Sequence, residues 1–357
     1  MSMSPTFPKV FDGHNDFLNF KLNAPIADCV TAFSEGSPGH IDLVKAAEGG
    51  LGGGFFAVYV SSPDEHVDLD GLTDIMANPP YALPNPDPVP IEVATPLIMK
   101  QIALLNALEA AGAVKVCTTV ADLEGCLQDG PMAAILHFEG AEGIDPDFHA
   151  LHVYQRAGLR SLGPVWSRDT RFAHGVPFTY PSTPDIGGGG LTEEGRALVR
   201  ECNRLGIMID LSHITEAGFW DVAAISDAPL VATHSNAHAV CPHSRNLTDK
   251  QLDAIAESDG MVGLNFATAF LRPDGKMVKE CETEILIRHL DHLISRLGED
   301  RVGIGSDFDG AVIPEQILNC RGLPVLQQAM ADHQYGAALI EKISHGNWMR
   351  ALGKVWR

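Results

Sequence analysis

Short apolar runs alternate with longer amphipathic stretches along almost the whole chain, and this rhythm restricts the fold more than any other feature. Strands that alternate with helices favour a parallel sheet with helical crossover connections. Several helical stretches open with a capping residue and an acidic first turn, as in Thr192-Glu193-Glu194. The predicted helices are Val93–Ala111, Thr119–Leu127, Thr192–Leu205, Thr215–Ala224, Thr248–Glu257 and Thr283–Leu297. The predicted strands are Lys9–Asp12, Gly54–Val60, Val114–Cys117, Met132–Phe138, Arg160–Val165, Ile207–Leu211, Leu230–Thr233, Met261–Asn265 and Val302–Gly305.

Roughly eight strand–helix units in a chain of 357 residues fit a (β/α)8 barrel better than a doubly wound sheet. A dinucleotide-binding fold is further disfavoured because no GxGxxG pattern follows the first strand. Two irregular stretches, at about residues 61–90 and 167–190, interrupt the rhythm, and it resumes after each. We therefore expect a single domain over residues 1–357. Both stretches are predicted to be loop insertions at the carboxyl ends of strands, where long loops commonly bind ligands or cover a site.

The charge balance argues against one class of partner. The chain has 46 acidic and 25 basic residues, which give a formal net charge of −21. Such a surface repels a phosphate backbone, so we expect no nucleic-acid partner, and a phosphodiesterase acting on nucleic acid is disfavoured.

The sequence predicts neither a secretion signal nor a membrane span. The segment MSMSPTFPKVFDGHND lacks a basic region followed by an apolar one, and no run of about 18 uninterrupted apolar residues occurs. The 7 cysteines are scattered without a CxxC pair, so most are expected to be buried thiols rather than a disulfide framework or a zinc knuckle. We expect a cytoplasmic protein that binds no membrane. Its oligomeric state stays open, a homodimer included.

Chemically active side chains follow five predicted strands, at the ends where a barrel carries its active site. The first strand ends in Asp12-Gly13-His14-Asn15-Asp16, and His14 and Asp16 point the same way in an extended segment. Each of the other four strand ends supplies one candidate: Glu139, His213, His234 and Asp307.

This set of imidazoles and carboxylates suits zinc or a similar divalent ion. Two ions are expected, because Glu139 can bridge a first ion held by the His-x-Asp pair and a second held by His213 and His234. Each ion would keep an open position for a shared water, as catalytic zinc sites do. Asp307 is left over, and a carboxylate beside metal-activated water is a natural proton carrier.

Each histidine alone would be a weak signal, because a lone His at a strand end more often forms a cap or a hydrogen bond. Asp309 is expected to shape a turn with Gly310, and His238 and His243 are expected to be loop residues. The joint occurrence at five strand ends is what favours a metal site.

Five segments resemble the membrane (renal) dipeptidase family of the metal-dependent amidohydrolase superfamily: FDGHND, HFEGAEG, GIMIDLSH, VATHSNAHAVCPHSRNL and VGIGSDFDG. They run from Phe11 to Gly310 in the family's order and spacing. The resemblance implies a binuclear zinc (β/α)8 barrel that hydrolyses dipeptides, including those with a D-residue at the C-terminal position. It implies the same ligands and proton-transfer role as above, and it assigns Arg245 to the substrate's carboxylate. A guanidinium suits that role because it is permanently charged and bidentate.

The chain departs from the family at the end of the fourth strand. The family commonly carries a Thr-His pair there, whose imidazole assists the substrate's scissile group, whereas this chain has Trp166. Indole donates one hydrogen bond but does not shuttle a proton near neutral pH. Either Arg168, Arg171 or His174 of the following loop fills the role, or the substrate differs. Trp166 and His174 are accordingly taken as candidate substrate-binding residues.

The sequence thus predicts a zinc-dependent dipeptidase that works by metal-activated hydroxide. A first alternative is a zinc-dependent hydrolase of another small carboxylate-bearing amide, such as an N-acyl amino acid, which Arg245 would serve equally well. A second alternative is a non-catalytic metal-binding barrel, which closed metal coordination would favour.

Overall fold

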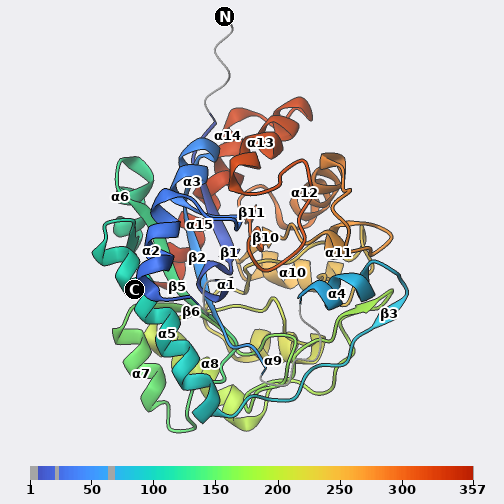
Figure 1. Cartoon of the computed structure of the whole chain (residues 1–357). Helices are drawn as coiled ribbons and strands as arrows, with labels where there is room; N and C mark the ends of the chain where they lie inside the picture. The colour runs from blue at the N-terminus through green and yellow to red at the C-terminus, as the bar shows by residue number, and fades with distance from the viewer. Residues whose placement is uncertain (1–6, 21–23, 63–68, 357) are drawn as a thin grey trace, which may run out of the picture.

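The computed structural model describes residues 7–20, 24–62 and 69–356. Its centre is a parallel β-barrel with the hydrogen-bonded order β8-β6-β5-β2-β1-β11-β10-β9 (Figure 1). A parallel bridge between Asp210 and Val231 joins the two ends of this order. The (β/α)8 barrel predicted from the sequence is therefore confirmed. The barrel strands are β1 (Val10–Asn15), β2 (Leu51–Tyr59), β5 (Met132–Glu139), β6 (Leu159–Gly163), β8 (Met208–Ile209), β9 (Val231–Ala232), β10 (Met261–Leu264) and β11 (Val302–Ile304).

A further strand, β4 (Val114–Val116), stands beside the ring. It pairs with the first half of β5, starting at Met132, whereas β6 pairs with the second half, from Leu136 onward. Residues two apart in a strand share a face, so Glu139 lies on the same face of β5 as Ile135, which belongs to the apolar cluster inside the barrel.

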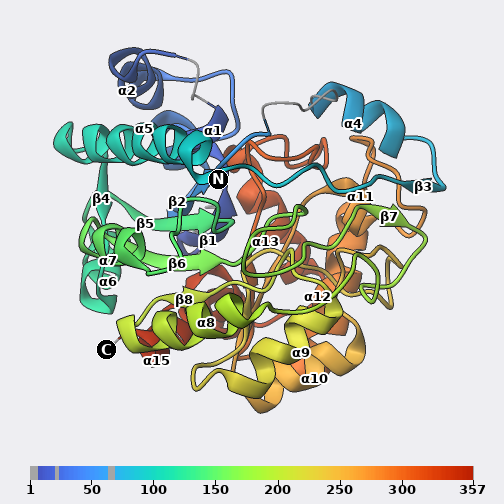
Figure 2. The same ribbon diagram turned by 90° about the horizontal axis from the view of Figure 1, so that it is seen from below.

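Helices surround the barrel on its outside (Figures 1 and 2). All six helices predicted from the sequence are present, with bounds within about two residues of those expected, the usual uncertainty of helix ends. Four of them are capped by a threonine whose hydroxyl accepts a backbone N–H: Thr119, Thr192, Thr215 and Thr248. The predicted helices correspond to α5 (Ile91–Ala110), α6 (Val120–Gln128), α8 (Glu193–Leu205), α9 (Glu216–Ile225), α10 (Asp249–Glu257) and α12 (Thr283–Leu297). The remaining outer helices are α1 (Phe17–Phe20), α2 (Ile26–Glu35), α3 (Leu43–Gly49), α7 (His149–Arg156), α13 (Leu323–Asp332), α14 (Ala337–Glu341) and α15 (Asn347–Val355).

Helix α5 is long and apolar enough, by length and composition, to cross a membrane. In this fold it packs on the barrel against α2 and β2, and buries residues such as Ile98, Leu105 and Leu108. A core helix of this kind passes the same test, so the finding is weak evidence for a span. The predicted cytoplasmic location stays a prediction.

The interior of the barrel is filled with apolar side chains beneath the strand ends. Phe11, Phe55 and Ile135 lie there together with Trp348 of α15, which is fully buried and donates its indole N–H to the Ile304 carbonyl at 2.9 Å. Gly13 lets the indole approach, because a Cβ at that position would lie 2.4 Å from the ring. The C-terminal helix thus contributes the ring that packs inside the barrel. All seven cysteines are free and buried, as expected.

The two interrupting stretches meet at the carboxyl ends of the strands. β3 (Tyr81–Ala82) from the first pairs antiparallel with β7 (Thr179–Tyr180) from the second, and Figure 2 shows them side by side near α4 and α11 (Thr268–Leu271). The expectation that 61–90 is an irregular loop is wrong in part, because α4 (Leu69–Met76) forms within it. The prolines and asparagines of this stretch lie outside the short helix, whereas Asp70 and Asp74 lie within it. Residues 63–68 of this stretch lie outside the described residues.

Candidate metal centre and active site

Three strand ends converge on the carboxylate of Glu139. Its Oε1 lies 3.1 Å from Nε2 of His213, 3.6 Å from Nε2 of His234 and 3.6 Å from Nε2 of His14. Asp16 completes the group, with Oδ2 3.4 Å from Nε2 of His14. All five residues are at most 5% exposed. The structure therefore brings together every ligand that the sequence predicted, from β1, β5 and the loops after β8 and β9.

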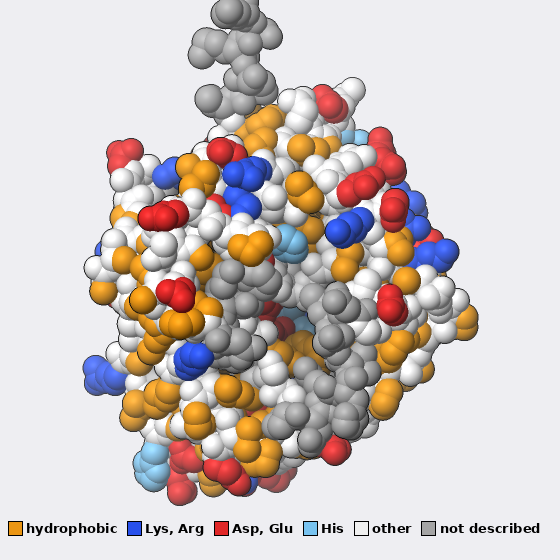
Figure 3. Space-filling view, viewed as in Figure 1, with side chains coloured by type: hydrophobic (Ala, Val, Ile, Leu, Met, Phe, Trp, Pro, Cys, Tyr) orange, Lys and Arg blue, Asp and Glu red, His pale blue; other side chains and the backbone are white. Residues whose placement is uncertain are grey.

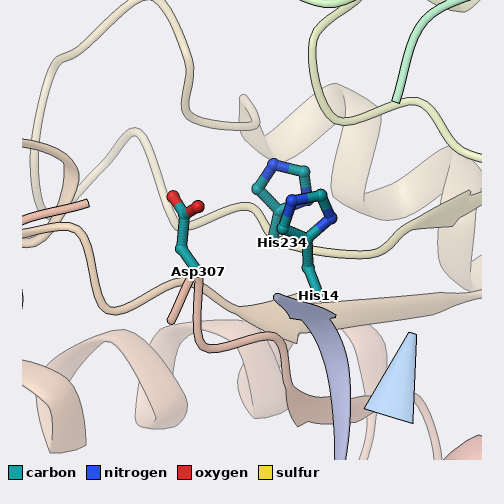
Figure 4. Close-up of side chains that lie close together, drawn as sticks. All are labelled: His14, His234 and Asp307. Atoms are coloured by element: carbon teal, nitrogen blue, oxygen red, sulfur yellow. The ribbon is translucent and has the colours of Figure 1, made fainter. Parts of the chain in front are cut away.

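These residues form two overlapping triads, and Glu139 belongs to both. One triad is His14, Asp16 and Glu139, and the other is Glu139, His213 and His234; the ligand atoms of each lie within 4.8 Å of one another. A third triad joins His14 and His234 to Asp307, whose side chain lies beside the two stacked imidazoles in Figure 4. Two triads that share a carboxylate are the arrangement expected for a bridged pair of ions.

Hydrogen bonds show that the facing histidine nitrogens carry lone pairs. Thr233 Oγ1 donates to Asp210 at 2.7 Å, so it accepts the proton of His234 Nδ1 at 2.8 Å and leaves His234 Nε2 unprotonated. Nε2 of His213 accepts from Arg245 Nη2 at 3.2 Å, because a guanidinium only donates. Yet Nε2 of His213 and Nε2 of His234 are 3.1 Å apart.

Such a group of electron-rich atoms is unfavourable unless a cation lies among them. Burial lowers the pKa values of His213 and His234 well below the usual range, which keeps both rings neutral and able to bind a metal. Burial raises the pKa of Glu139, because a buried carboxylate is destabilised without a partner charge. Both ring nitrogens of His14 lack a hydrogen-bond partner among the described residues. Burial alone would lower the pKa of His14, but Glu139 and Asp16 raise it to about 10, so the site attracts positive charge. The residues present fit divalent metal ions.

Two buried carboxylates, Asp210 and Asp12, hold together neighbouring strand ends that carry the metal-binding candidates. Asp210 accepts hydrogen bonds from the Thr233 amide at 2.8 Å and the Ser212 hydroxyl at 2.7 Å, which ties the segment after β8 to the end of β9. Asp12 does the same for β1 and β11, accepting from the amide and the hydroxyl of Ser306, each at 2.7 Å. Burial raises the pKa of Asp12 to about 6.

Asp307 lies at the edge of the metal centre, in the loop after β11. Its backbone is left-handed, with φ 62°, and its Oδ2 accepts from Asn265 Nδ2 at 3.0 Å. Burial raises the pKa of this carboxyl, against the lowering effect of His14. A carboxyl so placed and so shifted can hold a proton beside the reacting atoms. Asp309, expected to shape a turn, also has a left-handed φ of 67°, and its amide donates to His40 Nδ1 at 2.8 Å.

Arg245 lies beneath the wall of the site, 3% exposed. Besides His213, its guanidinium contacts the carbonyls of Ser212 and His234. Burial lowers its pKa to about 10, so it remains charged at neutral pH. Asp249, four residues further along the chain, pairs with His292 at 2.7 Å.

The residues after the fourth barrel strand separate into two groups. Trp166 lines the cavity above the metal centre, 5.8 Å from the His213 ring. His174 bonds to Asp169 at 2.8 Å and is not among the described residues that line this cavity. Arg168 is fully buried and paired with Glu142 at 2.6 Å, whereas Arg171 pairs with Glu194 at the surface.

The cavity opens on the face shown in Figure 3, where acidic and histidine side chains are visible at the bottom of a hollow. Its volume is about 290 Å³, enough for a ligand no larger than a small peptide. Glu139, His213, Asp16 and Asp307 reach its surface, and so do several apolar residues.

A profile of the family described as membrane dipeptidase (Peptidase family M19) matches residues 6–357. The chain belongs to this family. It is thus a metallo-dipeptidase by membership, and the resemblance seen in the sequence is confirmed.

Solved and curated relatives of this family member cover between 73% and 98% of the chain. A metallo peptidase from Rhodobacter sphaeroides, solved with a phosphinate mimic of the dipeptide L-Ala-D-Ala, is 55% identical, with a TM-score of 0.95 and coverage of 98% of this chain and 100% of that one. An uncharacterized protein of Klebsiella pneumoniae is 43% identical over 263 residues, 73% of this chain and 97% of its own length. A dipeptidase of Claviceps purpurea is 25% identical and covers 96% of this chain and 76% of its own length.

Sequence reasoning missed two kinds of residue in this dipeptidase. The first is the supporting pair Asp210 and Thr233, although IDLSH and VATHS place a polar residue within three positions of each histidine, which is a usable signal. The second is the set of apolar side chains that line the cavity, such as Phe178 and Phe270. These come from separate segments, and a single aromatic residue in a loop gives no local signal.

Proposed function

We propose that the protein is a binuclear zinc dipeptidase that hydrolyses small dipeptides, including those with a D-residue at the C-terminal position. The observation that carries the proposal is the carboxylate of Glu139 shared by two ligand triads at the bottom of a cavity. Membership of the dipeptidase family supports the reaction class. The dipeptide mimic bound by the Rhodobacter sphaeroides relative, with its D-residue, supports the substrate.

His14, Asp16 and Glu139 would hold one ion, and Glu139, His213 and His234 the other. When bound, the ions would polarise the scissile carbonyl and lower the pKa of a water molecule between them. The chain's own residues supply the remaining steps. Asp307 would take the proton of the attacking water and pass it to the leaving amine, a role for which its raised pKa is suited.

Arg245 would bind the substrate's terminal carboxylate. Nε2 of His213 cannot both accept a hydrogen bond from Arg245 and bind a metal ion, since each uses the same lone pair. Metal binding at His213 therefore frees one N–H of Nη2 for an anionic partner. The guanidinium stays anchored meanwhile by the carbonyls of Ser212 and His234.

The direct test is metal content and turnover measured on the same preparation. Protein kept free of chelators should contain close to two equivalents of metal, zinc being expected, and should cleave L-L and L-D dipeptides. Chelated protein should lose turnover and regain it with zinc. Full turnover with near-zero metal content would refute the proposal.

Variants of Arg245 test whether the enzyme recognises the free carboxylate of a dipeptide. Arg245→Met should weaken free-acid dipeptides strongly, because losing one partner of a desolvated charge pair costs on the order of 2–5 kcal/mol. Dipeptide amides should be poor substrates of the wild type and change little in the variant. Arg245→Lys should recover only part of the loss, since an ammonium does not match both carboxylate oxygens. Equal losses for acids and amides, together with lower thermal stability, would mean that Arg245 only braces the strand ends.

In the alternative function the substrate is an N-acyl amino acid. The metals and Arg245 keep their roles, but this substrate has no free amine. Assaying each dipeptide beside its N-acetylated form distinguishes the two, and faster cleavage of the acetylated form would favour the alternative.

A further inference from the structure

An acidic loop and the large ring of Trp166 both line the cavity above the metal centre. Asp307 and Asp309 follow β11, whereas Trp166 follows β6, and all three line the cavity. Three strands separate β6 from β11 in either direction around the ring. The acidic loop and Trp166 therefore lie on opposite sides of the mouth.

Trp166 belongs to a series of four rings in contact, which we call the aromatic row: Tyr59, Trp166, Phe178 and Phe270. Successive centroids are 5.2 Å apart for Tyr59 and Trp166, 5.5 Å for Trp166 and Phe178, and 5.7 Å for Phe178 and Phe270. These are ordinary packing distances for edge-to-face and tilted rings. Apolar side chains from other loops also line the cavity: Leu72, Met76, Met277 and Ala311.

One end of the row lies beside the proposed carboxylate-binding residue. The Arg245 guanidinium carbon is 5.4 Å from the Phe270 ring centroid. Trp166 and Phe178 lie 5.8 Å and 6.3 Å from the His213 ring. A C-terminal residue whose carboxylate pairs with Arg245 has its Cα one bond from that carboxylate. Its side chain would then reach the aromatic row.

The row is held in place from behind. Arg168 packs its guanidinium 5.6 Å from the Tyr59 centroid and 5.8 Å from that of Trp166, and its charge is paired with buried Glu142. The carbonyl of Phe178 accepts from the amide of Leu83 at 2.9 Å, so the first insertion fixes the position of this ring in the second. A wall supported in this way is preorganised for its ligand.

We propose that the aromatic row is the specificity pocket for the side chain of the C-terminal residue, and that it selects apolar side chains such as those of Leu, Met and Phe. This inference rests on the proposed function, because it takes the carboxylate position from Arg245. Apolar side chains gain from burial against these rings. A carboxylate or ammonium group placed there would lose its hydration against carbon atoms.

The test is a pair of dipeptide series, Ala-Xaa and Xaa-Ala, with Xaa as Gly, Ala, Leu, Phe, Asp and Lys, assayed on zinc-loaded protein. In the Ala-Xaa series, kcat/KM for Leu and Phe should exceed that for Gly by roughly 10–200-fold, the range typical of apolar pockets, and Asp and Lys should be slowest. The Xaa-Ala series should be flatter.

Variants of the aromatic row test whether these rings cause the preference for apolar side chains. Trp166→His should reduce the Leu-to-Gly ratio in the Ala-Xaa series by at least about tenfold. Trp166→Phe, which keeps the wall apolar and is milder for folding, should retain most of the ratio. Phe178→Ala removes a different ring of the row and should also lower the Leu-to-Gly ratio. The matched control is Trp220→His on α9, since Trp220 is 37% exposed and outside the cavity lining.

Two substrate profiles of the wild type would overturn the inference and leave the proposed function standing. One is turnover of dipeptides with a flat Ala-Xaa profile, and the other is apolar preference in the Xaa-Ala series alone. An unchanged ratio in both Trp166→His and Phe178→Ala would also overturn it. Absence of turnover on every dipeptide would overturn the proposed function, and this inference with it.

Discussion

At the scale of single residues, the hydroxyl of Thr233 decides which nitrogen of His234 faces Glu139. Because this hydroxyl donates to Asp210, it can only accept from His234 Nδ1. Thr233→Val keeps the shape of the side chain and removes the hydroxyl. We expect metal affinity to fall about 10–100-fold, as is typical when a supporting hydrogen bond to a ligand is lost.

The measurement for Thr233 is zinc affinity by competition with a chelator of known strength. Thr233→Ser is the matched control, because it keeps the hydroxyl, and its affinity should stay near that of the wild type. Equal affinities for the Val and Ser variants would show that the hydroxyl does not orient the ligand.

Asp307→Asn tests whether this residue carries protons or binds metal. The oxygen of the new amide can still accept the hydrogen bond from Asn265, but the amide cannot take up a proton. Turnover should therefore fall about 10²–10⁴-fold with metal content unchanged. Metal content and turnover should be determined on one preparation. Because Asp307 also lies in a triad with His14 and His234, a parallel loss of metal would identify it as a ligand instead.

At the scale of elements, His289 ties α12 to its neighbours. It is fully buried, with Nε2 2.8 Å from the Leu271 carbonyl at the end of α11 and Nδ1 accepting from the Ala237 amide at 3.2 Å. Burial lowers its pKa to about 4. Its stabilising contribution is therefore complete above pH 6.5 and is lost as the pH falls from 6.5 toward 4, with a slope of up to about 1.4 kcal/mol per pH unit.

Urea unfolding at pH 8 and pH 5, on metal-free protein, measures this contribution. His289→Gln should be destabilised at pH 8, and its difference from the wild type should shrink at pH 5. His292→Gln is the control for replacing another histidine of the same helix, one that pairs with Asp249 instead of lying in the core. A constant difference between wild type and His289→Gln at both pH values would contradict the assignment.

The elements differ in how well the sequence predicted them. Helices that begin at Thr192 and Thr248 carry their own caps and apolar faces, so local signals were sufficient. The first strand was predicted to end at Asp12 but continues to Asn15, which pairs with Phe56 of β2 and whose side chain donates to the Phe55 carbonyl at 3.0 Å. That contact lies 40 residues away in the sequence. Such a tertiary bond leaves no local pattern.

The same distinction applies to the candidate site. Each metal-binding candidate directly follows a strand, and the barrel topology alone brings such positions together. The aromatic row instead combines rings from the end of β2, the segments after β6 and helix α11, and apolar periodicity does not specify that these segments meet. The role of Trp348 could not be predicted from the sequence either. Its ring needs the space left by Gly13, Gly263 and Gly303, which lie on three strands far apart in the sequence.

At the scale of the whole molecule, metal binding should stabilise a barrel that is folded without it. Its strands and helices pack around a large apolar core, and the ligands occupy one end. A ligand at 100 times its Kd adds about 2.7 kcal/mol of stability. Chelation should therefore leave the far-ultraviolet circular dichroism unchanged and lower the Tm by several degrees, and added zinc should restore it. Loss of secondary structure on chelation would show that the metals hold the fold itself.

The pairing of β3 with β7 has a consequence for how such enzymes diverge. Tyr81 and Ala82 in one insertion are matched to Tyr180 and Thr179 in the other, about a hundred residues later in the chain. A graft of either insertion from a relative would meet a foreign partner strand and lose the bond that positions Phe178. The two insertions therefore have to be exchanged as a pair. A new substrate range arises more readily when both are replaced together.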